Sequence, residues 1–469
     1  MEGVKGRKRR YELDMTQGSI IRNLLIFAIP LLAGNLFQQL YNLVDTWVIG
    51  QTGDGGAYAA VGSVGPIINI LIGFFSGLAS GAGVVISQYF GAKDEANVRK
   101  TVHTSMVLTL IMGIAFTVIG VVMAPAMLKL MLRSTEDAEI YPFAKDYLTI
   151  YFAGVIGLMI YNMGSGILRA VGDSTRPLYF LIFSALLNVG LDFLFVFAFD
   201  LGASGVAWAT IISQGASALL VLFVMFRTDS CVKLILSEFR LDKEILKKII
   251  RIGIPAAIQM ALTAFANVFV QSYIANANGD MAVNLGGWTT YSKVDQFIFL
   301  PIQSLALATT TFVGQNLGVG DVKRAKKGTL YAYLMSTGAS ILIIVIVMIF
   351  ASPISGLFVK KNPDFVATSA LLLHFITPFY VFCSVNQILS ASLRGAGNAT
   401  APMIIMLSTF IGVRQIYLFT MSEFISNDLI PIAIGYPVGW FACATITLIY
   451  FLRFDFSSVK VINKTKAKE

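Results

Sequence analysis

The pattern that decides the architecture occurs twice, as LRAVGDSTRPLYFLIF in Leu168–Phe183 and as LRGAGNATAPMIIMLS in Leu393–Ser408. Leucine, arginine, glycine, threonine and proline recur at an offset of 225 positions. Other pairs at the same or nearly the same offset are Ile29 and Pro30 with Ile254 and Pro255, Asn42 with Asn267, and SQYFGAKDEANVRK from Ser87 with GQNLGVGDVKRAKK from Gly314. Matches in this order and spacing predict that the chain contains two copies of one unit.

The composition indicates a membrane protein. The chain has 469 residues, of which 56% are hydrophobic and only 13% charged, and its mean hydropathy is +0.74. A soluble protein typically carries about 25% charged residues. The apolar residues form blocks of roughly 20, the length that a helix needs to cross about 30 Å of hydrocarbon. Because a backbone in lipid must satisfy its own hydrogen bonds, and because these blocks do not alternate like barrel strands, they predict membrane-spanning helices.

Twelve such blocks follow one another along the chain. They lie at about 20–49, 59–89, 101–125, 143–165, 178–199, 204–227, 247–276, 282–313, 328–352, 366–391, 402–424 and 429–452. Each copy of the duplicated unit holds six, an even number, so both copies enter the membrane from the same side. The predicted fold is an all-α polytopic membrane protein with twelve transmembrane helices in two parallel six-helix repeats.

The net charge of +9 is concentrated in the two tails and in the even-numbered connections between spans. Lysine and arginine collect on the cytoplasmic side, so we expect both termini in the cytoplasm and no nucleic-acid partner. The expected location is a bacterial plasma (inner) membrane. The expected parts are a basic tail at 1–18, an N-terminal six-helix lobe at 19–228, a cytoplasmic linker at 229–246, a C-terminal six-helix lobe at 247–453 and a basic tail at 454–469. An amphipathic helix is expected from Glu238 to Arg251, at the membrane interface.

Metal-ligating residues are few or far apart in the sequence, and common catalytic motifs are absent from it. Cys231, Cys383 and Cys443 lie far apart without CxxC spacing, which argues against a metal knuckle or a disulfide framework. The chain has only two histidines and carries no HExxH, GxSxG or Walker motif. The sequence therefore favours a transporter without a cofactor over an enzyme or an ATP-driven pump.

Four polar side chains, Asp45, Asn188, Asp192 and Thr210, lie at similar depth inside the predicted spans of the N-terminal lobe. A carboxylate within a span is costly unless it is paired, hydrated or neutralised, so it is a candidate functional group. Two carboxylates, an amide oxygen and a hydroxyl suit a small hard cation, and the two aspartates could instead share a proton. The structural alternative places Asp45 in interfacial water and lets Asn188 and Thr210 bond to the backbone.

A second polar cluster, formed by Lys293, Asp295 and Gln296, lies in the eighth span. Lys293 and Asp295 are two residues apart and cannot face each other on one helix, so each needs another partner. Arg414 in the eleventh span is a candidate partner for Asp295. The cluster is either a buried structural ion pair or a gate or substrate contact, and the sequence leaves both open.

The first span combines polar residues with a helix-breaking proline. Gln38 and Gln39 could line a cavity or hold helices together by hydrogen bonds. Pro30, like its repeat partner Pro255, could mark a static bend or a hinge, because a proline inside a helix leaves a carbonyl without its donor.

Several short motifs resemble those of one transporter family. VDTWVIG at Val44–Gly50, NVGLD at Asn188–Asp192 and GVAWAT at Gly205–Thr210 accompany the LRAVGD and LRGAGN pair in the same order. From about Ile20 to Phe451, the chain resembles the multidrug and toxic compound extrusion (MATE) family, of the MOP type. The resemblance implies cation-coupled antiport, in which sodium ions or protons run inward and hydrophobic, mostly cationic drugs or toxic compounds are exported by alternating access.

The resemblance also implies roles for single residues. Asp45, Asn188, Asp192 and Thr210 match the family's cation-binding positions, which would hold Na⁺ if coupling is to sodium. Pro30 matches the proline about which the first helix is proposed to bend. The implied partners are the lipid bilayer, a coupling cation (Na⁺ or H⁺) and small organic substrates, and a monomer is expected.

One departure concerns the C-terminal lobe. NorM-like members carry acidic residues in the seventh and tenth spans, where this chain aligns Thr263 and Cys383. That leaves coupling to the N-terminal lobe and places the chain closer to the DinF-like branch. The alternative function is a flippase for a lipid-linked sugar or peptidoglycan precursor. A pyrophosphate headgroup would call for several cations facing a cavity, and inside the predicted spans, away from their ends, we find only Lys293 and Arg414.

Overall fold

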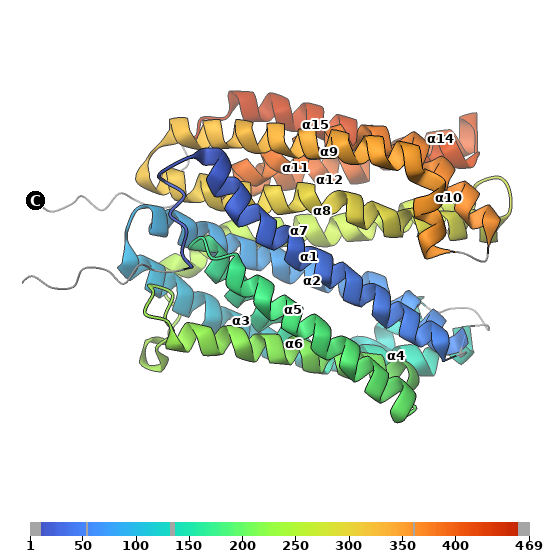
Figure 1. The fold of residues 1–469 in the computed structure, drawn as a ribbon, viewed down its shortest axis with the longest axis horizontal. Helices are drawn as coiled ribbons and strands as arrows, with labels where there is room; N and C mark the ends of the chain where they lie inside the picture. The colour runs from blue at the N-terminus through green and yellow to red at the C-terminus, as the bar shows by residue number, and fades with distance from the viewer. Residues whose placement is uncertain (1–10, 53–54, 132–136, 360–361, 458–469) are drawn as a thin grey trace, which may run out of the picture. The chain divides into compact units, whose positions relative to one another are not determined.

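The computed structural model describes residues 11–52, 55–131, 137–359 and 362–457. Within these ranges, twelve helices are long and apolar enough to cross a membrane, as the sequence predicted (Figure 1). Most of the basic residues of the two predicted tails, from Lys5 to Arg10 and from Lys460 to Lys468, lie outside the described residues. The cytoplasmic location of both termini therefore stays a prediction.

The first six spans have one central helix. The elements are α1 (Ile20–Gln51), α2 (Gly55–Gly91), α3 (Glu95–Met131), α4 (Asp137–Ala170), α5 (Thr175–Asp192) with its π-helical continuation η1 (Phe193–Ala198), and α6 (Gly202–Arg227). α4 is central because it packs against α2, α3 and α6. Its buried side chains recur every three to four residues, at Tyr147, Tyr151, Val155 and Leu158, which is the spacing of one helix face.

The second six spans contain more breaks. The elements are α7 (Lys243–Ala275), α8 (Met281–Val319), α9 (Val322–Phe358), α10 (Pro363–Ile376) and α11 (Tyr380–Gly395) joined by the turn Thr377–Phe379, α12 (Thr400–Leu407) and α13 (Arg414–Thr420) with π-helical segments at Ser408–Val413 and Met421–Ile425, α14 (Leu429–Ala433), and α15 (Gly435–Arg453). The tenth span, made of α10 and α11, packs against α8, α9 and α15. It therefore holds the central place that α4 holds in the first half, six spans earlier.

The turn between α4 and α5 explains the repeated LRAVGD pattern. The backbone N–H of Asp173 donates to the carbonyl of Leu168 (3.0 Å) and closes α4. Gly172 has φ +89°, and a β-carbon there would lie 2.2 Å from the carbonyl oxygen of Leu13. The Asp173 carboxylate accepts from the backbone N–H of Arg176 (3.1 Å) and so caps α5. Burial raises the pKa of the Asp173 carboxyl, although the paired Arg176 guanidinium opposes the rise.

The second copy, LRGAGN, makes the same turn between α11 and α12. The backbone N–H of Asn398 donates to the carbonyl of Leu393 (2.9 Å), and Gly397 has φ +93°. The Asn398 amide oxygen accepts from the backbone N–H of Ala401 (3.1 Å). Glycine adopts this φ without strain, and Asp and Asn both cap helices, so the repeated residues do the same structural work in both halves. The shared geometry supports the predicted duplication.

The chain forms two compact units that divide two of the helices. The first unit comprises Met1–Asp14 and Ile29–Gly253, and the second comprises Met15–Ala28 and Ile254–Glu469. Each unit contains one six-helix repeat, except that the first turns of α1 and α7 belong to the other unit. Both divisions fall two residues before a proline, Pro30 in α1 and Pro255 in α7. The repeated prolines thus mark the places where these helices pass from one unit to the other.

The segment that links the repeats differs from the expected one. The amphipathic stretch from Glu238 to Arg251 is not a separate helix, because α7 begins at Lys243 and continues to Ala275. The Asp242 carboxylate accepts from the backbone N–H of Ile245 (3.1 Å) and caps this helix. The helix then continues through Pro255 into the membrane span without ending.

Candidate ion and substrate sites

The first unit brings Asp45 on α1 together with Asp192, the last residue of α5. We call these two residues the carboxylate pair. Asp192 is fully buried and Asp45 half-buried, and the two carboxyl groups lie within hydrogen-bonding reach of each other. Among the described residues, no group donates to Asp45 Oδ1 or to either oxygen of Asp192. Two ionised carboxylates so placed repel each other, so the pair needs a proton or a cation from outside the protein.

Asn188 and Thr210 behave differently from each other. Asn188 lies one turn before Asp192 and is 2% exposed, and neither polar atom of its amide has a partner among the described residues. The structural alternative for Asn188, a bond to the neighbouring backbone, is therefore wrong. The Thr210 hydroxyl does donate to the backbone, to the carbonyl of Val206 (2.9 Å). Its oxygen keeps lone pairs for another partner.

The packing of α5 on α6 sets the level of Asn188. The Ser217 hydroxyl donates to the carbonyl of Phe180 (3.3 Å), and the Ser184 hydroxyl donates to the carbonyl of Ser213 (2.9 Å). From the first contact to the second, the residue number rises by four on α5 and falls by four on α6, as in two antiparallel helices. Four residues further along α5 is Asn188, and four residues further back along α6 is the turn that carries Thr210, so these two lie at the same level.

Two tyrosines that the sequence analysis did not single out, Tyr41 and Tyr147, lie near the carboxylate pair. Tyr147 on α4 interacts electrostatically with both aspartates, and Tyr41 on α1 interacts with Asp45. Gln38 hydrogen-bonds to Tyr41, which gives this predicted cavity residue a place beside the pair, whereas no described contact links Gln39 to it. The four-residue spacing of Tyr147 and Tyr151 on one face of the fourth span was the only available signal.

Among the described residues, no conventional metal cage surrounds the pair. In the part of the chain that the structure describes, no three His, Cys, Asp or Glu side chains come together. A cation at the carboxylate pair would therefore take its other ligands from neutral oxygens, which a sodium ion accepts and a transition metal rarely does.

In the second unit, Asp295 and its candidate partner Arg414 do not pair with each other but with different residues. Arg414 is 1% exposed and donates from both terminal nitrogens to Asn267 Oδ1, at 3.3 and 3.4 Å. Asp295 Oδ1 instead accepts from the hydroxyl of Tyr291, at 3.4 Å. Both charged groups interact with Tyr436, whose ring centre lies 5.0 Å from the guanidinium carbon. The two charges share a neighbour rather than a direct contact.

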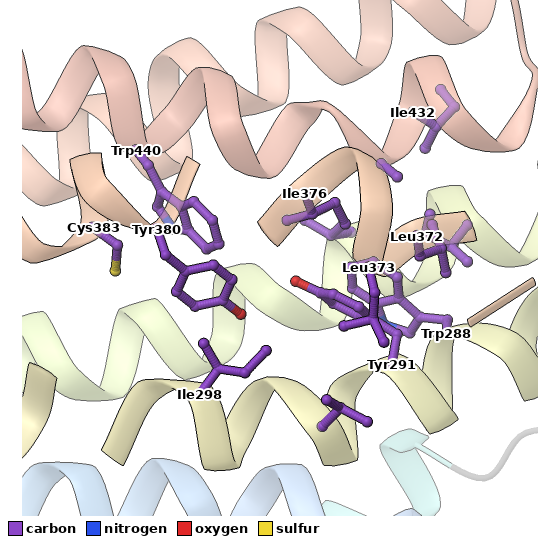
Figure 2. Close-up of a cluster of buried hydrophobic side chains, with 14 of the residues drawn as sticks. Trp288, Tyr291, Ile298, Leu372, Leu373, Ile376, Tyr380, Cys383, Ile432 and Trp440 are labelled. Atoms are coloured by element: carbon purple, nitrogen blue, oxygen red, sulfur yellow. The ribbon is translucent and has the colours of Figure 1, made fainter. Parts of the chain in front are cut away.

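Five rings of the second unit form a contiguous set that includes Tyr291, the hydrogen-bond partner of Asp295, and we call this set the aromatic cluster. Its members are Trp288, Tyr291, Tyr380, Tyr436 and Trp440. Their ring centres lie 5.0 Å apart for Trp288 and Tyr291, 5.3 Å for Trp288 and Tyr436, 5.7 Å for Tyr436 and Trp440, and 4.9 Å for Tyr380 and Trp440. Figure 2 shows the hydroxyl ends of Tyr291 and Tyr380 turned toward the same region. The Tyr380 hydroxyl is buried without a partner among the described residues.

The remaining predicted positions of this unit are less engaged. Lys293 is half-buried and Gln296 exposed. No described carboxylate lies within 4.0 Å of the Lys293 nitrogen. The Thr263 hydroxyl donates to the carbonyl of Gln259 (2.7 Å), and Cys383 is 3% exposed within the apolar core. These two neutral side chains leave the second unit without a counterpart of the carboxylate pair in its seventh and tenth spans.

Comparison with known proteins identifies the family of the chain. The MatE family model matches residues 30–194 and 255–420, once in each repeat. The chain belongs to the MatE family. It is 30% identical over 433 residues to the probable multidrug resistance protein YpnP of Bacillus subtilis, covering 92% of this chain and 95% of that protein. It is 25% identical over 466 residues to the probable multidrug resistance protein NorM of Thermotoga maritima, covering 96% of each.

Solved structures agree on the fold. A multidrug resistance MATE family transporter of the MOP superfamily, in an outward-facing conformation, superimposes with a TM-score of 0.89 at 24% identity, covering 98% of this chain and 100% of that one. The predicted fold class and the family resemblance are both confirmed. This MatE chain is therefore a membrane transporter and not an enzyme, while the DinF-like branch stays a prediction.

Proposed function

We propose that the protein is a cation-coupled antiporter that exports hydrophobic, mostly cationic organic compounds by alternating access. The names of its relatives in Bacillus subtilis and Thermotoga maritima, both probable multidrug resistance proteins, support an export role. The observation that carries the coupling is the carboxylate pair, because three of its four oxygens are buried without a donor among the described residues. An incoming sodium ion or proton supplies the positive charge that the pair lacks.

Either ion suits the chemistry of the site. A sodium ion would be held by the carboxylates of Asp45 and Asp192, the amide oxygen of Asn188 and the hydroxyl oxygen of Thr210. The Thr210 hydroxyl already donates a hydrogen bond to the backbone, so the lone pairs of its oxygen are available to a cation. A proton would be shared between the two carboxylates alone, because like charges this close cannot both stay ionised.

Pro30 is the proposed hinge that links the ion to the transport cycle. The part of α1 that belongs to the first unit begins at Ile29, the residue before this proline. Proline cannot donate to the carbonyl four residues earlier, so the helix bends there at low cost. Asp45 lies 15 residues further on, about 22 Å along the axis at about 1.5 Å per residue, so a bend of about 10° displaces its carboxylate by about 4 Å. Such a displacement separates the carboxylate pair.

The cycle follows from this coupling. An ion enters at Asp45 and Asp192, α1 bends near Pro30, and the bound compound is displaced outward. The ion-loaded protein then turns inward, releases the ion and takes up another compound. Coupling requires that the ion and the compound favour different states of the transporter.

Proteoliposomes that contain a fluorescent organic cation test the proposal. An imposed sodium gradient or proton gradient is expected to drive its release, and Asp45→Asn is expected to abolish that release. Asp200→Asn is the matched control, since Asp200 is an exposed carboxylate at the end of the fifth span and its φ of +54° is one that asparagine tolerates. Release at the wild-type rate by a well-folded Asp45→Asn protein would overturn the assignment.

The flippase alternative has its own outcome in this experiment. A chain that binds the organic cation but responds to neither gradient would favour it. Movement of a fluorescent lipid-linked precursor across vesicles containing the protein would then replace antiport as the activity.

A further inference from the structure

Arg414 carries a buried charge that has no anionic partner in the part of the chain that the structure describes. Its side chain is 1% exposed, and its Nε–H has no acceptor among the described residues. Among the described residues, the terminal nitrogens donate to the neutral amide oxygen of Asn267, and the ring centres of Phe410 and Tyr436 lie 5.2 and 5.0 Å from the guanidinium carbon. A guanidinium inside a membrane span normally pairs with a carboxylate or marks a functional site. Its donor geometry suits a planar anion such as a carboxylate.

The helix that carries Arg414 is rearranged directly before it. The π-helical segment Ser408–Val413 ends at the residue before Arg414, whereas the equivalent residues 183–188 of α5 are regular α-helix. A π-helical segment accommodates one extra residue, and such segments are frequent at functional sites. Beyond it, the offset between the repeats grows from 225 to 226, and Arg414 corresponds to Asn188. The second unit thus has a fixed cation at the sequence position where the first unit has an amide of its proposed cation site.

Asp295 supplies the opposite charge in the same unit. Its carboxylate is half-buried, so solvent reaches part of it, and the described group that donates to it is the Tyr291 hydroxyl. Two members of the aromatic cluster, Tyr291 and Tyr436, interact with it, and ring faces attract delocalised organic cations. Tyr436 interacts with Asp295 on the one hand and with Arg414 on the other. A carboxylate, an aromatic surface and a guanidinium are therefore neighbours within one unit.

We propose that Asp295, the aromatic cluster and Arg414 form a substrate subsite for aromatic zwitterions, compounds that carry both a delocalised cation and a carboxylate. The inference rests on the proposed export function and names a substrate class for it. The cationic group binds at Asp295 against the rings, and the anionic group binds at Arg414 in place of the long hydrogen bonds to Asn267. Tyr436 is half-buried and covers the guanidinium, so rotation of this one side chain exposes Arg414 to the ligand.

The test is equilibrium binding of two dyes to the purified full-length protein in detergent, without an ion gradient. Rhodamine B carries a delocalised xanthylium cation and a carboxylate, whereas its ethyl ester keeps only the cation. Wild-type protein is expected to bind rhodamine B at least about tenfold more tightly than the ester. Arg414→Gln is expected to weaken rhodamine B binding by about 10- to 100-fold and to leave the ester within about threefold, because only the carboxylate loses a charge-assisted hydrogen bond.

Three further variants separate recognition from folding. Arg414→Lys keeps the charge without the planar fork and is expected to retain part of the preference for rhodamine B. Asp295→Asn is expected to weaken both dyes by about tenfold or more. Arg453→Gln, the same substitution at an exposed arginine of this unit, is expected to change neither. Should Arg414→Gln fail to fold, Arg414→Lys decides, by whether rhodamine B loses affinity relative to the ester.

Equal weakening of both dyes by the Arg414 variants, or of neither, would overturn the inference. Because no gradient is applied, this result is independent of the coupling experiment. Intact dye preference without gradient-driven release would contradict the antiport and leave the subsite standing. Gradient-driven release without the dye preference would contradict only the subsite.

Discussion

The two units share a backbone pattern but hold opposite balances of buried charge. The carboxylate pair of the first unit combines two acids with no described cation close enough to form an ion pair. In the spans of the second unit, the half-buried acid Asp295 occurs together with the buried cation Arg414 and the half-buried Lys293. The first unit therefore depends on a positive charge from outside the protein, and the second carries its own. The turns are thus the same in both repeats, while the polar side chains differ and form a proposed ion site in one unit and a proposed substrate site in the other.

The largest expected effect comes from giving the first unit the charge of the second. Asn188→Arg places a guanidinium one turn from Asp192. Arg414 occupies the equivalent position of the eleventh span. We expect gradient-driven transport to fall by at least about 100-fold, because an internal cation replaces the coupling ion. Sodium or acid should no longer raise the thermal unfolding midpoint, which ligand binding otherwise does.

Asn188→Met is the control for bulk without charge. Its unfolding midpoint should still respond to the ion, since the carboxylate pair remains. Ion-dependent stabilisation that persists in Asn188→Arg would remove the distinction between the two units.

The paired prolines give the next effect. Pro30→Ala is expected to slow transport by about tenfold, because a restored backbone hydrogen bond stiffens α1 where Asp45 depends on its bending. Pro255→Ala is expected to change the rate by less than about threefold, since α7 carries no member of the carboxylate pair. Initial rates of gradient-driven release in matched proteoliposomes measure both. A larger effect at Pro255 would move the hinge to the other repeat.

A smaller effect distinguishes the two coupling ions. Thr210→Val removes one candidate oxygen ligand while keeping the size of the side chain. If sodium is the coupling ion, its apparent affinity should fall by about 3- to 10-fold, as the loss of one ligand of several predicts. If the proton is the ion, transport should stay at the wild-type rate. Sodium titrations of transport rate measure this, and a loss under a pure proton gradient would contradict the assigned role.

The smallest effect concerns what the units share. Gly172→Ala and Gly397→Ala each force a β-carbon into a left-handed backbone conformation, which costs about 1–2 kcal/mol. Each should lower the thermal unfolding midpoint by a few degrees. The midpoint should fall further for Gly172→Ala, because its β-carbon would also meet the carbonyl of Leu13. A neutral result at either position would contradict the structural explanation of the repeated motif.

Much of the fold could be predicted from the sequence, because length and apolarity alone identify spans in a membrane. The offset of 225 positions between the LRAVGD and LRGAGN motifs also revealed the duplication. Asp45 and Asp192 could be selected because acids in spans are rare. The structure brings these two together, 147 positions apart in sequence.

Other features depend on tertiary contacts that no local pattern encodes. Tyr147 looks like any core aromatic residue until α4 is packed beside α1 and α5. The separation of Arg414 from Asp295 depends on the position of Tyr436 and on a π-helical segment without a sequence signature. The division of α1 and α7 between the two units follows from packing, although Pro30 and Pro255 mark its place.

The central claim is that the carboxylate pair couples ion entry to export, and ion movement itself tests it most directly. In proteoliposomes, uptake of radioactive sodium or acidification of the lumen would be recorded while an organic cation is supplied on the opposite side. For wild-type protein and the Asp200→Asn control, we predict ion influx that requires the organic cation. For a well-folded Asp192→Asn protein we predict none. Compound-dependent ion influx at the wild-type rate in Asp192→Asn would contradict the account.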